Sequence, residues 1–235
     1  MTVDRPKFLA CAQLLRLPNA FTAMADPLAG WFAIGGGVPA WKLPLLVVAS
    51  ACLYTSGIVF NDLFDYDLDC VEHPERPLPS GAVSLKTAWV LGVALMIVGL
   101  ALAGIAGPVP LGIAVFLAGM IFFYNAWARR IAALRPLVLG SSRFANFLLG
   151  MRCFPLRLSW MPAVLGVYAG LITFLSTYEA GNPTLQRIIR QMLLGIIVVD
   201  AIIVLLSPFG DWVGVLLVLS LLVPAFVLGK AFATA

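Results

Sequence analysis

The sequence is dominated by apolar stretches of about 20 residues, which is the length that an α-helix needs to cross a bilayer. Proline, glycine or charged residues bound each stretch. With 62% hydrophobic and 11% charged residues, the chain lies outside the range of soluble globular proteins. The sequence therefore predicts an all-α, polytopic membrane helix bundle.

Dividing the chain at these boundaries predicts about eight transmembrane helices. Their expected ranges are 15–35, 43–62, 84–106, 110–128, 136–153, 160–178, 190–207 and 212–232. The first stretch lacks a small-residue cleavage site, so we expect a retained span rather than a signal peptide. No long soluble segment separates the spans, so we expect one membrane-embedded domain over 1–235.

An even number of spans places both termini on the same side of the membrane. The basic residues on that side are Arg5, Lys7, Arg16, Arg76, Lys86, Arg129, Arg130, Arg135, Arg187, Arg190 and Lys230. Those on the other side are Lys42, Arg152 and Arg157. Because basic loops stay in the cytoplasm, both termini are expected to be cytoplasmic.

Charge is concentrated in residues 61–81, which contain six of the eleven acidic residues. If the preceding helix continues, a rotation of about 100° per residue places Asp62, Asp65 and Asp69 on one stripe and Asp67 elsewhere. Three such carboxylates repel one another unless a cation lies between them, and hard oxygen ligands suit Mg²⁺. We therefore expect a phosphate-bearing substrate; the alternative is a solvated acidic cap on a membrane helix.

The order of these residues, N-D-x-x-D-x-x-x-D followed by R-P-L-P-S-G, resembles the first aspartate motif of the UbiA family of intramembrane prenyltransferases. In that family the aspartates bind Mg²⁺ and, through it, the diphosphate of an isoprenoid donor. By this resemblance Asp62, Asp65 and Asp69 are expected metal ligands and catalytic residues. Asn61 and Arg76 are expected to bind the substrate.

The resemblance extends over Y-N-A-W-A-R-R and G-S-S-R-F-A-N-F-L-L-G, between residues 124 and 150. Family members show a similar tyrosine, a basic residue five positions later, and an R-x-x-N-x-x-x-G run. This match implies a catalytic role for Arg129 and substrate binding by Tyr124, Arg143 and Asn146. Lys86 is a further expected cation for the diphosphate.

Polar residues inside the predicted spans are expected to face the bundle interior, because ionisable groups are costly in lipid. Asn19, an expected substrate-binding residue, shares a helix face with Asp26. Asp200 lies in the middle of the seventh span. A buried ion pair of Arg143 with Asp26 or Asp200 competes with a substrate role for the arginine.

The resemblance fails in two places. The family has a second acidic motif, usually paired aspartates, where this chain has only Glu179, an expected weak metal ligand. The run T-x-L-S-x-x-E around it is similar to that of a divergent EboC-like branch. The family also commonly has nine helices, whereas eight are predicted here, and the difference lies at the C-terminus.

The leading interpretation is Mg²⁺-dependent transfer of a prenyl group from an isoprenoid diphosphate to a hydrophobic acceptor, either aromatic or a lipid alcohol. Phe122, Phe123 and Tyr124 are candidates to shield an allylic carbocation. One alternative is a catalytically weak relative that binds or moves a lipid diphosphate or serves a membrane assembly. Another is an ion-coupled transporter that uses Asp26 and Asp200. The bilayer is an expected partner, a nucleic acid is not, and a protein partner is undetermined.

Overall fold

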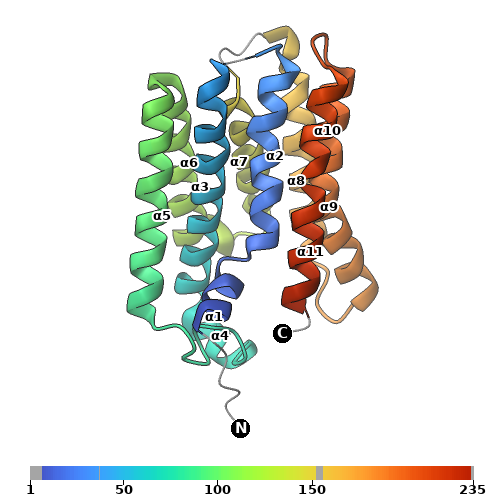
Figure 1. Cartoon of the computed structure of the whole chain (residues 1–235). Coiled ribbons are helices and arrows are strands. Elements are labelled where there is room, and N and C mark those ends of the chain that lie inside the picture. The colour runs from blue at the N-terminus through green and yellow to red at the C-terminus, as the bar shows by residue number, and fades with distance from the viewer. Residues whose placement is uncertain (1–6, 37, 152–155, 234–235) are drawn as a thin grey trace.

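The computed structural model describes residues 7–36, 38–151 and 156–233, and every regular element in that part of the chain is helical. Long helices lie side by side in one bundle (Figure 1). The elements are α1 (Lys7–Leu14), α2 (Leu17–Ala33), η1 (Ala40–Lys42), α3 (Leu43–Phe64), α4 (Tyr66–Glu72), α5 (Leu85–Ala106), α6 (Pro108–Ala126), η2 (Ala128–Arg130), α7 (Leu134–Leu149), η3 (Leu156–Leu158), α8 (Trp160–Ser176), α9 (Pro183–Leu206), α10 (Trp212–Ser220) and α11 (Leu222–Ala233). The predicted all-α membrane bundle is confirmed.

The eight predicted spans correspond to α2, α3, α5, α6, α7, α8, α9 and the pair α10 and α11. Among the described residues, five helical segments are long and apolar enough to cross a membrane: Ala40–Phe64, Leu85–Ala106, Pro108–Ala126, Pro183–Leu206 and Trp212–Lys230. The last span is interrupted at Leu221. Pro224 explains the break, because it has no N–H for the carbonyl of Ser220 and its ring crowds that carbonyl.

The helices pack around two main cores. One is formed by α3, α5 and α6, with Leu53, Phe60 and Met96 among its buried residues. The larger one joins α2 to α7 and the helices that follow, with Phe147 and Ile196 near its centre. In Figure 1, α5 and α6 lie on one side of the bundle and α9, α10 and α11 on the other, with α2, α3 and α7 between them. α2, α3 and α7 therefore form the middle of the bundle and contact one another.

Glycines allow α2 and α7 to cross in very close contact. A Cβ atom added to Gly30 would collide with the backbone oxygen of Phe147, and one added to Gly150 would collide with that of Pro27. Small residues permit this approach between membrane helices. The crossing brings the polar residues of α2 within reach of those of α7.

α1, α4 and the end of α11 lie at the same end of the bundle (Figure 1). The connection between α4 and α5 lies there too, and buried Leu78 and Val83 fix it to the core. Gly81, in the R-P-L-P-S-G run, has φ +74°, a left-handed conformation that glycine adopts without strain. Both ends of the described chain are thus on the same side as the acidic segment.

Candidate functional site

Three aspartates at the end of α3 and in α4 each face an arginine from another segment. The pairs are Asp62 with Arg16, Asp65 with Arg129, and Asp69 with Arg76. Arg16 Nη2 lies 2.9 Å from Asp62 Oδ1, and Arg76 Nη1 lies 2.6 and 2.8 Å from the two oxygens of Asp69. We call these six residues the aspartate end.

The helical path through the aspartate end is almost continuous. α3 ends at Phe64, where the sequence predicts that the helix continues, but only Asp65 separates it from α4. The amide of Asp65 donates to the carbonyl of Asn61, and the amide of Asp69 donates to the carbonyl of Asp65, at 3.0 and 2.8 Å. The expected helical spacing of the carboxylates is therefore largely retained.

Burial divides the carboxylates as the helical spacing predicts. Asp62 and Asp69 are 6% and 3% exposed, Asp65 is half-buried, and Asp67 is exposed. A buried carboxylate is costly unless a cation or hydrogen-bond donors accompany it. The arginines of the aspartate end provide that compensation.

The three arginines come from short connections rather than from the long helices. Arg16 joins α1 to α2 with φ +44°, an uncommon conformation for a residue with a side chain. Arg76 belongs to the connection anchored by Leu78 and Val83, and Arg129 lies in η2. The arginines of the aspartate end are therefore positioned by the connections, whereas the carboxylates lie along the path from α3 into α4.

Arg129 bridges η2 to the end of α3. Its Nη2 donates to the carbonyl of Phe64 at 2.9 Å, and its guanidinium lies 6.0 Å from the centre of that ring. Partial burial, together with repulsion from Arg130 and Arg135, lowers the pKa of Arg129 from its ordinary value. A guanidinium nevertheless stays protonated in proteins, so Arg129 remains a cation beside Asp65.

An internal cavity of about 270 Å³ lies between α3, α6, α7, α8 and α9. Four residues predicted to bind substrate line it: Asn61, Tyr124, Arg143 and Asn146. Asn61 also connects the cavity to the aspartate end, because its Nδ2 donates to Asp65 Oδ2 at 2.9 Å. The cavity and the aspartate end therefore form one continuous site.

A second ion pair lies deep in the bundle. Arg143 Nη1 lies 3.1 Å from Asp26 Oδ2, and Asn146 Nδ2 donates to the same oxygen at 2.6 Å. Arg143 also donates to the backbone and side-chain oxygens of Thr22. With the neighbouring Asp200, these residues form what we call the inner polar cluster. The ion-pair alternative for Arg143 is thus what the structure shows, while its side chain still borders the cavity.

Pro27 explains how Asn146 is held. A proline has no N–H, so the carbonyl of Ala23, four residues earlier in α2, loses its helical partner. That oxygen accepts hydrogen bonds from Ser50 Oγ at 2.7 Å and from Asn146 Nδ2 at 2.9 Å. The proline in α2 therefore creates a polar contact between three helices.

Asp200, in the middle of α9, is completely buried. Neither of its carboxyl oxygens has a hydrogen-bond partner in the described part of the chain. Its charged neighbours are Asp26 and Arg143. When Asp200 is neutral, the positive charge of Arg143 is balanced by the negative charge of Asp26.

Other predicted residues lie outside these contacts. Asn19 is half-buried in α2 and Lys86 is exposed in the first turn of α5, and neither side chain makes a hydrogen bond or ion pair with the described residues. Phe122 and Phe123 are 42% and 40% exposed and are not among the cavity residues. Phe122 packs against the buried ring of Phe60, with ring centres 5.1 Å apart, and the expected role of these two residues in shielding a carbocation stays a prediction.

Glu179 lies in the connection between α8 and α9, at the same end of the bundle as α4 (Figure 1). Its backbone oxygen accepts a hydrogen bond from Gln186 Nε2 at 3.2 Å. Its expected position across the site from the aspartates stays a prediction. Arg5 and Arg152, which contribute to the charge asymmetry, lie outside the described residues.

The aspartate end fits Mg²⁺ by the chemistry of its donors. Carboxylate oxygens are the hard ligands that this ion takes, and each carboxylate already has a positive group against it. Within the described residues, however, no group of three His, Cys, Asp or Glu side chains is arranged to hold a metal ion. In this structure each carboxylate of the aspartate end faces a guanidinium instead of a neighbouring carboxylate.

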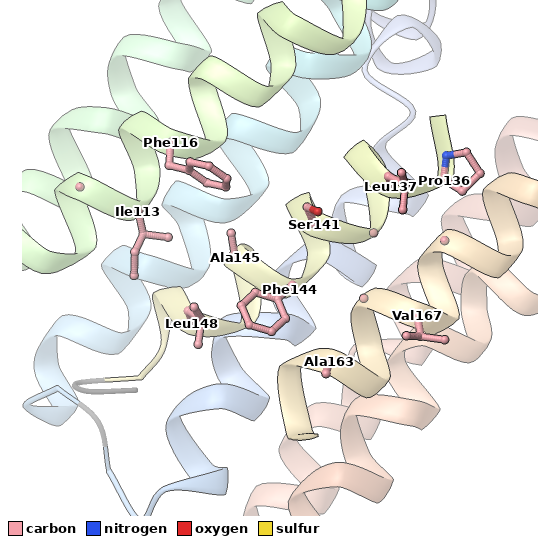
Figure 2. Close-up of a pocket in the computed structure, with 14 residues that line it drawn as sticks. Ile113, Phe116, Pro136, Leu137, Ser141, Phe144, Ala145, Leu148, Ala163 and Val167 are labelled. Carbon is pink, nitrogen blue, oxygen red and sulfur yellow. The ribbon is translucent and has the colours of Figure 1, made fainter. Parts of the chain in front are cut away.

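A hollow of about 800 Å³ lies on the outer surface between α6, α7 and α8, and we call it the outer groove. Figure 2 shows Phe116 of α6, Phe144 and Leu148 of α7, and Val167 of α8 around it. Its walls are almost entirely apolar, and none of the predicted site residues lines it. We place the functional site in the smaller internal cavity, where the charged groups are.

Residues 21–234 match the family model of the UbiA prenyltransferases. The match covers most of the chain, so this protein belongs to the UbiA prenyltransferase family.

Relatives within the family are named digeranylgeranylglyceryl phosphate synthase. The protein from Methanothrix thermoacetophila is 27% identical over 166 residues, which is 70% of this chain and 60% of the relative. The one from Methanoculleus marisnigri is 27% identical over 235 residues, covering 87% of this chain and 78% of the relative. With the first of these, the chain aligns over about three fifths of the relative's length. These names do not support the EboC-like assignment.

Solved structures share the fold. One described as a digeranylgeranylglyceryl phosphate synthase in membranes has a TM-score of 0.66 and 20% identity, covering 95% of this chain and 88% of that one. A UbiA homologue from Archaeoglobus fulgidus bound to GPP and Mg²⁺ has a TM-score of 0.61 and 17% identity, covering 92% of this chain and 85% of that one. At these identities the likeness establishes the architecture.

Sequence reasoning missed two residues of the site. Arg16 is predicted only as a basic anchor at the membrane surface, although it pairs with Asp62. Asn125 lines the cavity beside Tyr124 but carries no predicted role. Neither residue lies at a recognisable spacing from the aspartates, so only their proximity in space reveals them.

Proposed function

We propose that this chain catalyses Mg²⁺-dependent transfer of a prenyl group from an isoprenoid diphosphate to a lipid acceptor. The observation that carries the proposal is the aspartate end, where three carboxylates and three guanidiniums meet beside an internal cavity. Separate positive and negative groups of this kind suit a ligand that combines a metal cation with an anionic diphosphate.

Binding is an exchange of partners. The guanidiniums of Arg16, Arg76 and Arg129 bind phosphate oxygens, with the paired geometry that arginine offers to such groups. The carboxylates thereby released, Asp62, Asp65 and Asp69, would hold Mg²⁺, which neutralises charge on the leaving diphosphate when bound. The arginines add to this stabilisation because they remain beside the charge that develops there.

The internal cavity receives the reacting end of the isoprenoid chain. Its lining is mainly apolar, which excludes the water that would otherwise capture an allylic carbocation. Tyr124 is the aromatic residue of the predicted set that lines this space, and its ring face can stabilise positive charge. Asn61 holds Asp65 at the cavity entrance, and Arg143 and Asn146 fix the deeper wall.

The acceptor is proposed from the names of the relatives. Digeranylgeranylglyceryl phosphate carries two geranylgeranyl groups on glyceryl phosphate, so the last transfer that forms it would use the singly prenylated glyceryl phosphate as acceptor. We extend this acceptor class, a hydroxyl on a glyceryl phosphate lipid, to the present chain. It replaces the wider choice between an aromatic compound and a lipid alcohol.

The proposed orientation places the aspartate end and both chain termini in the cytoplasm. The ends of the described chain share one side of the bundle with α4, in agreement with an even number of spans (Figure 1). The excess of basic residues on that side supports a cytoplasmic location. A reporter fused to Ala235 tests it, and a reporter signal from the opposite side of the membrane would contradict it.

The activity is tested with purified protein, Mg²⁺, labelled geranylgeranyl diphosphate and geranylgeranylglyceryl phosphate. We expect a doubly prenylated product and stoichiometric pyrophosphate, both abolished by chelation of the metal. Parallel reactions with 4-hydroxybenzoate and with other prenyl diphosphates define the preference for each substrate. No product above background with any pair of substrates would overturn the proposal.

A second candidate function is a catalytically weak relative that binds or moves a lipid diphosphate. It is favoured by the lack of a preassembled three-carboxylate metal group in the described residues and by the single carboxylate, Glu179, in place of a second acidic motif. In that case the prenyl diphosphate binds without release of pyrophosphate. The same reactions therefore separate the two functions.

A further inference from the structure

Asn125, near the end of α6, has an unused hydrogen-bond acceptor. The residue is 2% exposed and lines the internal cavity. Its Nδ2 donates to the carbonyl of Ile121 at 2.9 Å, which fixes the amide orientation because the reverse would place two oxygens together. Its Oδ1 has no partner among the described residues. A buried amide oxygen without a partner is uncommon and requires an explanation.

The neighbouring hydroxyl groups of the cavity have already used their protons. Ser142 donates to the carbonyl of Val138 at 2.9 Å, and Thr173 donates to that of Ala169 at 3.0 Å. Each hydroxyl has one proton, so its remaining capacity is to accept a hydrogen bond. On the wall that Asn125 shares with them, the side chains can therefore still accept hydrogen bonds, and Asn125 Oδ1 is the one buried acceptor there that has no partner among the described residues.

The strong donors of the cavity are also engaged. Arg143 and Asn146 donate to Asp26 and to backbone oxygens of α2. The hydroxyls of Tyr54 and Tyr124, which also line the cavity, can donate as well as accept. A ligand group that contacts Asn125 must accordingly bring a proton of its own.

We propose that Asn125 forms a subsite that accepts a hydrogen bond from the reacting hydroxyl of the prenyl acceptor. This inference rests on the proposed function and adds the chemical class of the group that enters the subsite, which is a neutral hydroxyl. A phosphate or carboxylate oxygen has no proton to offer and would face the oxygen of Asn125 directly. The anionic headgroup of the acceptor therefore binds elsewhere.

The position of Asn125 agrees with this role. It lies beside Tyr124 and shares the cavity with Asn61, whose Nδ2 donates to Asp65. Arg129, the partner of Asp65, follows four residues later in the chain. A hydroxyl held by Asn125 is thus in the cavity that adjoins the diphosphate site, where the new carbon–oxygen bond forms.

The test compares two probes, geranylgeranylglyceryl phosphate and its methyl ether, in which the free hydroxyl is methylated. Their affinities are measured with the non-reactive donor analogue geranylgeranyl thiolodiphosphate and Mg²⁺ present. An unpaired buried acceptor costs enough that we expect wild type to bind the hydroxyl probe about tenfold more tightly. In Asn125→Leu, which keeps the size but removes the acceptor oxygen, we expect the two affinities to agree within about twofold.

Two controls keep this test decisive. Asn125→Asp keeps an acceptor oxygen and should retain the preference for the hydroxyl probe even if Asn125→Leu folds poorly. Ser141→Ala removes a hydroxyl that faces the outer groove and should leave the preference unchanged. A tenfold preference that persists in Asn125→Leu would overturn the inference, as would wild type that binds both probes equally. Failure of the proposed function is seen separately, as wild type that forms no doubly prenylated product and releases no pyrophosphate in the activity assay.

Discussion

The aspartate end and the inner polar cluster both pair aspartate with arginine, but in opposite surroundings. At the aspartate end the side chains of Arg16 and Arg76 are 41% and 35% exposed, and both come from connections. In the inner polar cluster the side chains of Arg143 and Asp26 are 10% and 0% exposed, and both lie on packed helices. The same chemical pair therefore serves two purposes.

Exposure decides how easily each pair can separate. At the aspartate end the carboxylates of Asp62 and Asp69 are buried, but the side chains of their arginines reach solvent, so a ligand can approach each pair from its guanidinium side. Removing one member of a buried pair leaves an uncompensated charge and costs about 3–5 kcal/mol. We conclude that the aspartate end is built to exchange partners, whereas the inner polar cluster is built to hold α2 against α7.

The largest effect should follow from Asp26→Ala. The substitution leaves Arg143 buried without its carboxylate, so we expect the free energy of unfolding to fall by about 3–5 kcal/mol. Thermal unfolding in detergent measures the change. As a control, Asp26→Ala combined with Arg143→Leu should recover part of the stability, since both buried charges are then removed. Wild-type stability in the single variant would contradict the assignment of this pair.

Asp65→Ala should affect binding and not folding. We expect affinity for a prenyl diphosphate to fall at least tenfold, about 1.4 kcal/mol, while the helical content stays as in wild type. Asp67, two residues away and exposed, provides the matched control, and Asp67→Ala should have a much smaller effect. Equal losses in both variants would refute the helical stripe that separates them.

Arg16→Gln tests whether the exposed arginine of the aspartate end binds the ligand or stabilises the fold. The exposed guanidinium pairs with Asp62 and is proposed to bind phosphate oxygen, so we expect about a three- to tenfold loss of diphosphate affinity. The unfolding free energy should fall less than in Asp26→Ala, because the Arg16 side chain is 41% exposed whereas both members of the inner pair are buried. A strong loss of stability with unchanged binding would make Arg16 a structural residue instead.

Asp200→Asn should produce the smallest change. The amide resembles a neutral carboxyl group, so the variant preserves the charge balance between Asp26 and Arg143. We expect a stability within about 1 kcal/mol of wild type, in contrast to Asp26→Ala. A large loss of stability would show that Asp200 is ionised and that a cation in the inner polar cluster depends on it.

The sequence alone predicts the helices well, because membrane spans are defined by length and apolarity. The division of the last span at Leu221 follows from Pro224 and was open to prediction, whereas the interruption at Asp65 has no comparable signal. Among the site residues, Asn61 and Asp65 are four positions apart, a spacing at which side chains are neighbours on a helix, and they form a hydrogen bond. Helical periodicity thus predicts contacts between residues that are close in the sequence.

Contacts between segments are harder to predict. No spacing rule places Arg16 next to Asp62, 46 residues away, or Arg143 next to Asp26, 117 residues away. These contacts depend on the close crossing of α2 and α7 and on connections whose course is set by packing. Glu179 shows the same limit, since its place in a loop leaves its distance from the aspartates open.

The central claim is that the aspartates exchange their arginine partners for Mg²⁺ and a diphosphate. Calorimetric titration with geranylgeranyl thiolodiphosphate, with and without Mg²⁺, tests it directly in wild type and in Asp62→Asn. We expect Mg²⁺ to raise the affinity of wild type at least tenfold, and this gain to disappear in Asp62→Asn, whose amide is a poor metal ligand. An affinity that does not depend on Mg²⁺, or a gain that Asp62→Asn retains, would contradict the claim.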